Sequence, residues 1–85
     1  MTTPDHVRLV AFAAARDLIG AGRAELPLAA PCTAGELWAE LVRHYPVLSP
    51  YRGTIRLAVN GRWAEDDARV SLGDEVALLP PVSGG

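Results

Sequence analysis

The hydrophobic pattern near the two ends of the chain predicts two buried strands. Residues 7–13 are apolar apart from Arg8, which is too apolar for a strand with one face in water. Residues 75–79 form a second apolar stretch. Because these are the most apolar strands of the chain, we expect them to lie side by side, in parallel, at the centre of a sheet.

The segment after the first strand predicts a short helix and an edge strand. Residues 14–19 fit a helical turn, and Gly20 can end it in the left-handed conformation. Residues 23–28 then alternate between polar and apolar, as a half-buried strand does. Pro27 cannot donate a hydrogen bond to a neighbouring strand, so we place this strand at the edge of the sheet.

The main helix begins at a clear capping signal. Thr33 and Glu36 have the spacing of a capping box, in which each side chain bonds the backbone amide of the other residue. Cys32 and Leu37 then occupy the two positions of a hydrophobic staple. The apolar residues that follow recur at three- and four-residue spacing, which is typical of one buried helix face; they are Leu37, Trp38, Leu41, Val42 and Tyr45.

The segment after the helix predicts a hairpin. Pro46 ends the helix, and Pro50 is expected to keep the next segment irregular. Residues 54–59 alternate as a strand, and residues 62–64 form the return strand. The Asn-Gly pair between them is the strongest short hairpin signal, because a type I′ turn needs positive φ at both central positions. Acidic residues 65–67 then read as a solvated loop, and residues 72–75 as the turn into the last strand.

The order of these elements predicts an α+β fold. We expect a four- or five-stranded mixed sheet with one main helix across it. This order of strands and helices matches a β-grasp domain.

The charge balance excludes several classes of partner. The 85 residues include eight arginines, no lysine and ten acidic residues, for a net charge of −2, which provides no basic surface for nucleic acid or anionic lipid. The longest stretch without a charged or turn residue, 9–15, is far shorter than the roughly 20 residues of a membrane span. Residues 1–6 lack the pattern of a signal peptide. We therefore expect one small cytoplasmic domain, with no membrane partner.

Ordinary catalytic and metal-binding constellations are absent from the sequence. His6 and His44 have no second ligand at metal-binding spacing, and each is expected to be a solvated side chain or a helix-end residue. Cys32 next to a helix start could have a lowered thiol pKa, but the staple explains it better, and one cysteine cannot form an internal disulfide. Residues 65–67 lack the glycine and the bidentate glutamate of a calcium loop. No metal and no cofactor bound by this chain are expected.

The end of the sequence is its unusual feature. We expect a domain over residues 1–79 and an extended tail over residues 80–85. The two prolines that open the tail favour an extended chain and cannot join the sheet, so its six residues would reach roughly 20 Å from the domain. The final glycine pair has no side chains, and it could enter a channel too narrow for other residues. The alternative is an ordinary frayed terminus.

The residues at the two ends together resemble a known family. Three segments are similar to the MoaD family. The first is residues 7–13 with the Arg-Asp-Leu-Ile-Gly of residues 16–20, and the second is Leu-Ala-Val-Asn-Gly at 57–61. The third and most specific is Gly-Asp-Glu-Val followed by a terminal Pro-Pro-Val-Ser-Gly-Gly, within residues 73–85. Members of this family are small sulfur-carrier subunits of molybdopterin synthase, related to ThiS-like carriers with a ubiquitin-like β-grasp fold. The resemblance covers essentially the whole chain.

The resemblance implies a carrier rather than an independent enzyme. The Gly85 carboxylate would be adenylated with ATP by a MoeB-like adenylyltransferase, receive sulfur from a persulfide donor and become a thiocarboxylate. It would then deliver sulfur to cyclic pyranopterin monophosphate in the active site of a MoaE-like large subunit, within a heterotetramer. Catalytic side chains are expected in that large subunit, and ATP is used by the activating enzyme.

The resemblance also implies roles for individual residues. Gly84 would be the narrow neck behind Gly85, and the stiff arm would consist of Pro80, Pro81, Val82 and Ser83. An apolar docking patch beside the base of the arm would involve Phe12, Leu78 and Leu79, which could instead belong to the core. Arg16 could contact the activating enzyme or be an ordinary surface arginine.

Three other functions stay open on the sequence alone. A carrier of the same design could serve thiazole synthesis or tRNA thiolation. A ubiquitin-like modifier would form an isopeptide bond to a lysine through Gly85. A simple binding module would not need the glycine pair.

Overall fold

Two strands from opposite ends of the chain pair in parallel at the centre of the fold. The computed structural model describes residues 4–80. In it, β1 (His6–Ala11) lies beside β7 (Glu75–Leu79), with the register running from Arg8 opposite Glu75 to Ala11 opposite Leu78. The predicted central parallel pair is confirmed, although β1 ends two residues before the predicted end of this strand.

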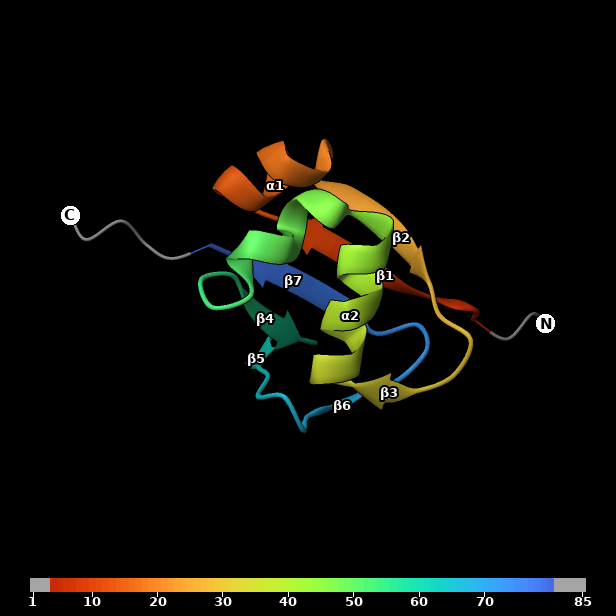
Figure 1. Cartoon of the computed structure of the whole chain (residues 1–85). Helices are drawn as coiled ribbons and strands as arrows, with labels where there is room; N and C mark the ends of the chain where they lie inside the picture. The colour runs from red at the N-terminus through yellow and green to blue at the C-terminus, as the bar shows by residue number, and fades with distance from the viewer. Residues whose placement is uncertain (1–3, 81–85) are drawn as a thin grey trace.

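The main sheet has five strands in the order β2-β1-β7-β4-β5. β2 (Arg23–Pro27) pairs antiparallel with β1 and forms one edge, as Pro27 predicted. β4 (Arg56–Val59) pairs antiparallel with β7 and with β5 (Arg62–Trp63). The sheet is therefore mixed, and the predicted α+β class is confirmed (Figure 1).

The hairpin between β4 and β5 has the predicted turn. Asn60 and Gly61 have φ values of 52° and 83°, as a type I′ turn requires. The Asn60 side chain also accepts a hydrogen bond of 3.0 Å from the Glu75 amide, which ties the turn to the start of β7. β4 begins at Arg56 and not at the predicted residue 54, because the amides of residues 54 and 55 bond the Tyr51 carbonyl instead.

Helix α2 (Ala34–His44) crosses one face of the sheet (Figure 1). The capping box is present: the Glu36 amide donates to the Thr33 hydroxyl at 3.2 Å, and the Thr33 amide donates to the Glu36 carboxylate at 2.9 Å. Leu37 and Leu41 are completely buried. They pack with the residues of alternate sheet positions that point to the same side, among them Val7, Leu9, Leu57, Val76 and Leu78.

Two shorter helices flank the end of the sheet at which β7 finishes. α1 (Ala13–Ile19) is closed by Gly20, which has a φ of 83° and donates its amide to the Arg16 carbonyl. η1 (Pro46–Tyr51) is a 3₁₀ helix, so the prediction of an irregular segment was wrong. Proline at the first position fits the φ that a helix start requires, and the fully buried Leu48 fixes the segment against the core.

A second, two-stranded sheet was not predicted. β3 (Cys32–Thr33) pairs antiparallel with β6 (Arg69–Val70). Two residues are too short to show an alternating pattern, and the partners lie far apart in the sequence. Val70 is completely buried, so this pairing holds the loop before β7 against the start of α2.

The described part of the chain has an entirely apolar interior. Among residues 4–80, no polar or charged residue is buried, and every buried side-chain nitrogen or oxygen has a hydrogen-bond partner. None of the helices in this part is both long and apolar enough to span a membrane.

Candidate functional site

The predicted tail begins at the end of the central strand. β7 is hydrogen-bonded on both sides, to β1 and to β4, and Pro80 follows its last residue directly. The predicted roles of Pro81, Val82, Ser83, Gly84 and Gly85 lie outside the described residues and stay predictions. The described site is therefore the surface around the point where β7 ends.

Leu78 and Leu79 point to opposite sides of the sheet. Successive strand residues alternate between faces, and Leu78 is 0% exposed on the side of α2. Leu79 is half-buried on the opposite side. The expectation that both leucines belong to a docking patch is thus corrected: Leu78 belongs to the core, and Leu79 remains available to a partner.

Phe12 lies next to Leu79 on the same face. Its backbone is extended (φ −118°, ψ 147°), and its amide donates to the Leu78 carbonyl at 3.3 Å, so Phe12 continues the pairing of β1 with β7. The side chain therefore points to the side opposite α2. It is 48% exposed, which decides between the two readings of this residue: Phe12 is not a core residue.

Sequence reasoning missed two residues of this face. Trp63 lies opposite Ala58, and Ala58 lies opposite Ala77, so all three share the side of the sheet opposite α2. Trp63 is 58% exposed. Arg56 lies opposite Leu79, and its guanidinium carbon is 4.3 Å from the centroid of the Trp63 ring. The two-residue turn set this register, so counting outward from Asn-Gly would have placed Trp63 beside Ala58.

These residues define one surface beside the base of the tail, which we call the docking surface. Phe12 continues β1 and Trp63 lies on β5, and the axes of these two strands are three interstrand spacings apart, or roughly 14 Å. The small side chains of Ala77 and Ala58 lie on the strands between them. An exposed pair of large aromatic residues of this kind is typical of a protein interface. The docking surface consists of Phe12, Leu79, Arg56, Ala77, Ala58 and Trp63.

Arg16 is exposed on α1. A Cβ atom added to Gly22 would lie 3.3 Å from the Cδ atom of Arg16, so the arginine stem lies against the glycine backbone. Within residues 4–80, Arg16 forms no salt bridge, not even with the neighbouring Asp17. Whether this arginine contacts an activating enzyme stays a prediction.

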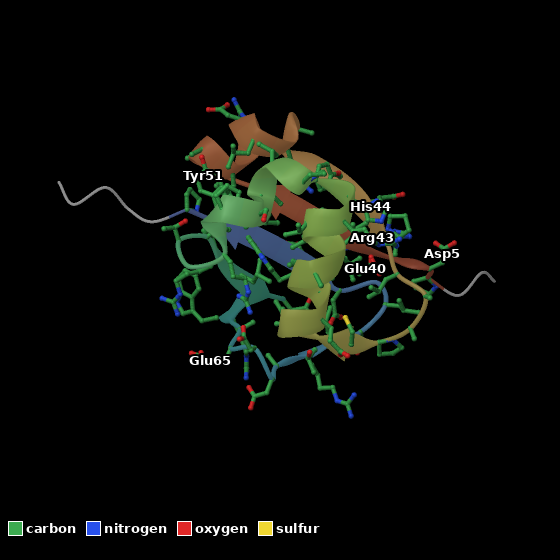
Figure 2. All side chains as sticks on the ribbon, in the orientation of Figure 1. Asp5, Glu40, Arg43, His44, Tyr51 and Glu65 are labelled. Atoms are coloured by element: carbon green, nitrogen blue, oxygen red, sulfur yellow. The ribbon has the colours of Figure 1, made fainter. Side chains whose placement is uncertain are left out.

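The remaining candidates for chemistry lie elsewhere. Burial raises the pKa of the Cys32 thiol, and the carboxylates of Glu36 and Glu40 raise it further, so this thiol is a poor nucleophile. His44 lies on the right-hand side of Figure 2, whereas β7 ends on the left. His6 begins β1 beside Asp5, at the opposite end of the sheet from the one where the parallel β7 finishes. Among residues 4–80 there is no group of three or more metal-ligating side chains.

The acidic loop has a structural contact. Asp66 accepts a hydrogen bond of 2.6 Å from the Arg52 guanidinium, and its carbonyl accepts one from the Gly35 amide. The same guanidinium lies 5.5 Å from the centroid of the Trp38 ring. These contacts hold the loop against the beginning of α2.

The fold and this surface define a ubiquitin-like β-grasp domain, in which a central strand leads into the C-terminal segment. The ThiS family matches residues 9–85. The chain belongs to this family, and the resemblance found in its sequence is confirmed.

Named relatives match almost the whole chain. The molybdopterin synthase sulfur carrier subunit of Arabidopsis thaliana is 34% identical over 84 residues, which cover 99% of this chain and 88% of the relative. The protein of the same name from Homo sapiens is 32% identical over 83 residues, which cover 94% of each chain.

Solved structures share the fold. Small archaeal modifier protein 1 of Haloferax volcanii is 26% identical, with a TM-score of 0.79, over 91% of this chain and 98% of that one. A putative molybdopterin converting factor subunit 1 from Pyrococcus furiosus is 25% identical, with a TM-score of 0.75, over 91% and 98%. The predicted β-grasp fold is therefore confirmed.

Proposed function

We propose that this chain is the sulfur carrier subunit of molybdopterin synthase. The observation that carries this function is similarity along almost the entire chain to relatives of that name, in a sequence that ends on Pro-Pro-Val-Ser-Gly-Gly. The family model also extends to Gly85. The predicted sulfur-carrier role agrees with both findings.

The chemistry takes place at the Gly85 carboxylate. A carboxylate is a poor electrophile until one of its oxygens becomes part of a leaving group. An adenylyltransferase therefore joins this oxygen to the α-phosphate of ATP and releases pyrophosphate. The terminal sulfur of a persulfide donor then displaces AMP and forms an acyl disulfide with the Gly85 carbonyl. A thiol reductant attacks the donor's sulfur in this disulfide and breaks the S–S bond, which leaves the thiocarboxylate that supplies sulfur to cyclic pyranopterin monophosphate.

The folded domain presents the tail and binds the partners. β7 holds the base of the tail through hydrogen bonds to β1 and β4, so the tail starts from a strand that is paired on both sides. Pro80 cannot donate a further ladder bond, and the chain can leave the sheet there. The large subunit supplies the acid, base and phosphate-binding groups, and the activating enzyme binds ATP. The sulfur transfer takes place in the cytoplasm.

The docking surface brings the large subunit to the base of the tail. Phe12, Leu79 and Trp63 give it exposed apolar area at the end of β7. A standard interface buries about 800 Å² per partner, so the large subunit would cover a sizeable part of a surface that totals 5428 Å². Leu78 does not take part, because its side chain faces the core.

Intact-mass measurement tests the carrier function. The full chain is incubated with ATP, an activating enzyme and a sulfur donor, and the expected product has one oxygen replaced by sulfur at the C-terminus. The matched control lacks Gly84 and Gly85 and should stay unmodified. If the shortened chain restores molybdenum-enzyme activity in a strain without its own carrier, the proposal is wrong.

A second candidate function is protein modification. It is favoured by the likeness to small archaeal modifier protein 1, which is named as a modifier. In this case Gly85 would form an isopeptide bond with a lysine of a target protein. Mass spectrometry of cellular proteins would then detect Gly-Gly remnants on lysines, and these would disappear when the gene for this chain is deleted.

A further inference from the structure

The charges on the face opposite α2 are not evenly distributed along the strands. At the end where β7 finishes, Arg56 lies opposite Leu79, and Arg23 lies opposite Val10. At the other end, Arg8 lies between Glu25 and Glu75. Among the paired strand residues of this face, the half nearer the tail carries Arg23 and Arg56 and no carboxylate, whereas in the far half Arg8 lies opposite Glu25 and Glu75.

Arg56 is held in position by an aromatic ring and not by an acid. Its guanidinium carbon lies 4.3 Å from the Trp63 ring centroid, which is the geometry of a cation–π contact. None of the salt bridges among residues 4–80 involves Arg56. Stacking on the ring fixes the orientation of the guanidinium. Its N–H donors stay free to form paired hydrogen bonds with the two oxygens of a carboxylate.

We propose that Arg56 is a specificity-determining residue that pairs with a carboxylate at the rim of the apolar patch on the protein that receives the tail. This inference rests on the proposed function and adds the sign of the charge that the partner must present. Trp63 supplies apolar contact and orients the guanidinium, and Arg56 selects the partner. The docking surface therefore binds a protein surface with acidic residues at its rim. Arg56 is stacked on Trp63 and has no carboxylate partner in its own chain, so its charge is complementary to a carboxylate of the partner.

The physical consequence is a rate effect. Interface charges speed the encounter of complementary surfaces, and this acceleration falls as salt screens it. Trp63, as a large aromatic residue that is 58% exposed, is expected to act on the lifetime of the complex instead. The two neighbouring residues should therefore alter different rate constants.

Association kinetics of the full chain with its molybdopterin synthase large subunit test this inference. Arg56→Glu should slow association by about tenfold at low salt and weaken the dependence of the rate on salt. Arg56→Lys should recover most of the rate because it keeps the charge. Trp63→Ala should mainly speed dissociation. Arg8→Glu, a charge reversal on the same face but beyond the patch, is the matched control and should change the rate by less than about twofold.

The possible outcomes separate the two proposals. If Arg56→Glu associates as fast as the wild type, or if Arg8→Glu slows association equally, the inference is overturned and the carrier function stands. If the wild-type chain does not bind the large subunit at all, both fail. Sedimentation of the chain alone should show a monomer; a dimer that Trp63→Ala dissolves would assign the surface to a second copy and would also overturn the inference.

Discussion

Two adjacent leucines allow a direct test of whether one face of the last strand stabilises the core and the other binds a partner. We predict that Leu78→Ala destabilises the domain, whereas Leu79→Ala leaves it folded and weakens docking. The two substitutions remove the same atoms from neighbouring positions of β7. Their effects should differ because Leu78 is 0% exposed within the core, whereas Leu79 faces the opposite side of the sheet.

The magnitude follows from burial. Replacing a fully buried leucine by alanine removes apolar contacts and leaves a cavity, at a cost of about 3 kcal/mol within a range of roughly 2–5 kcal/mol. A domain of this size has a free energy of unfolding of roughly 4–13 kcal/mol. The loss should lower Tm by roughly 12–24 °C. For Leu79→Ala, which creates no enclosed cavity, the cost should stay at about 1 kcal/mol or less.

Thermal unfolding followed by circular dichroism measures the first effect, and calorimetric titration with the large subunit measures the second. Titration is carried out at a temperature where both variants are folded. The reasoning is refuted if Leu79→Ala lowers Tm as much as Leu78→Ala does. It is also refuted if Leu78→Ala unfolds at the temperature of the wild type, since Leu78 would then not be a core residue.

Three further predictions concern the helix start, the thiol and the hairpin. Hydrogen bonds from Thr33 lower the pKa of Glu36 in the folded state. The stabilisation from these bonds is therefore fully present above the unfolded-state pKa and is lost as the pH falls through the lower folded-state pKa. Glu36→Gln should therefore remove that part of the pH dependence in urea titrations; an unchanged acid limb would contradict it. Because burial and nearby carboxylates raise the pKa of Cys32, iodoacetamide should alkylate it more slowly at pH 8 than in the urea-unfolded chain, and equal rates would argue against this environment. Gly61→Ala should cost about 1 kcal/mol, because φ is 83° there. Gly53→Ala is its control, since Gly53 also has open space around it but no positive φ, and equal melting temperatures for the two variants would show that φ is not the cause.

The sequence predicted best where one residue or a short pattern decides the local structure. The capping box at Thr33, the left-handed Gly20 and the Asn-Gly turn depend on contacts within four residues, so their chemistry can be read directly. The apolar content of the first and last strands also sufficed to pair them in parallel. The sequence did not predict β3, because its partner β6 is distant in the sequence; Val70 of β6 pairs with Cys32 and is completely buried.

The sequence alone determined that the chain has an α+β fold, because hydrophobic period and turn residues are local properties. The tertiary structure decided which apolar residues face a partner. Leu78 and Leu79 have the same composition and the same propensity, and only the pairing of β7 between β1 and β4, with α2 over one side, assigns one to the core and the other to the surface. The same pairing brings Arg56 onto Trp63, a contact across the hairpin that becomes visible only when the register and the side-chain positions are known.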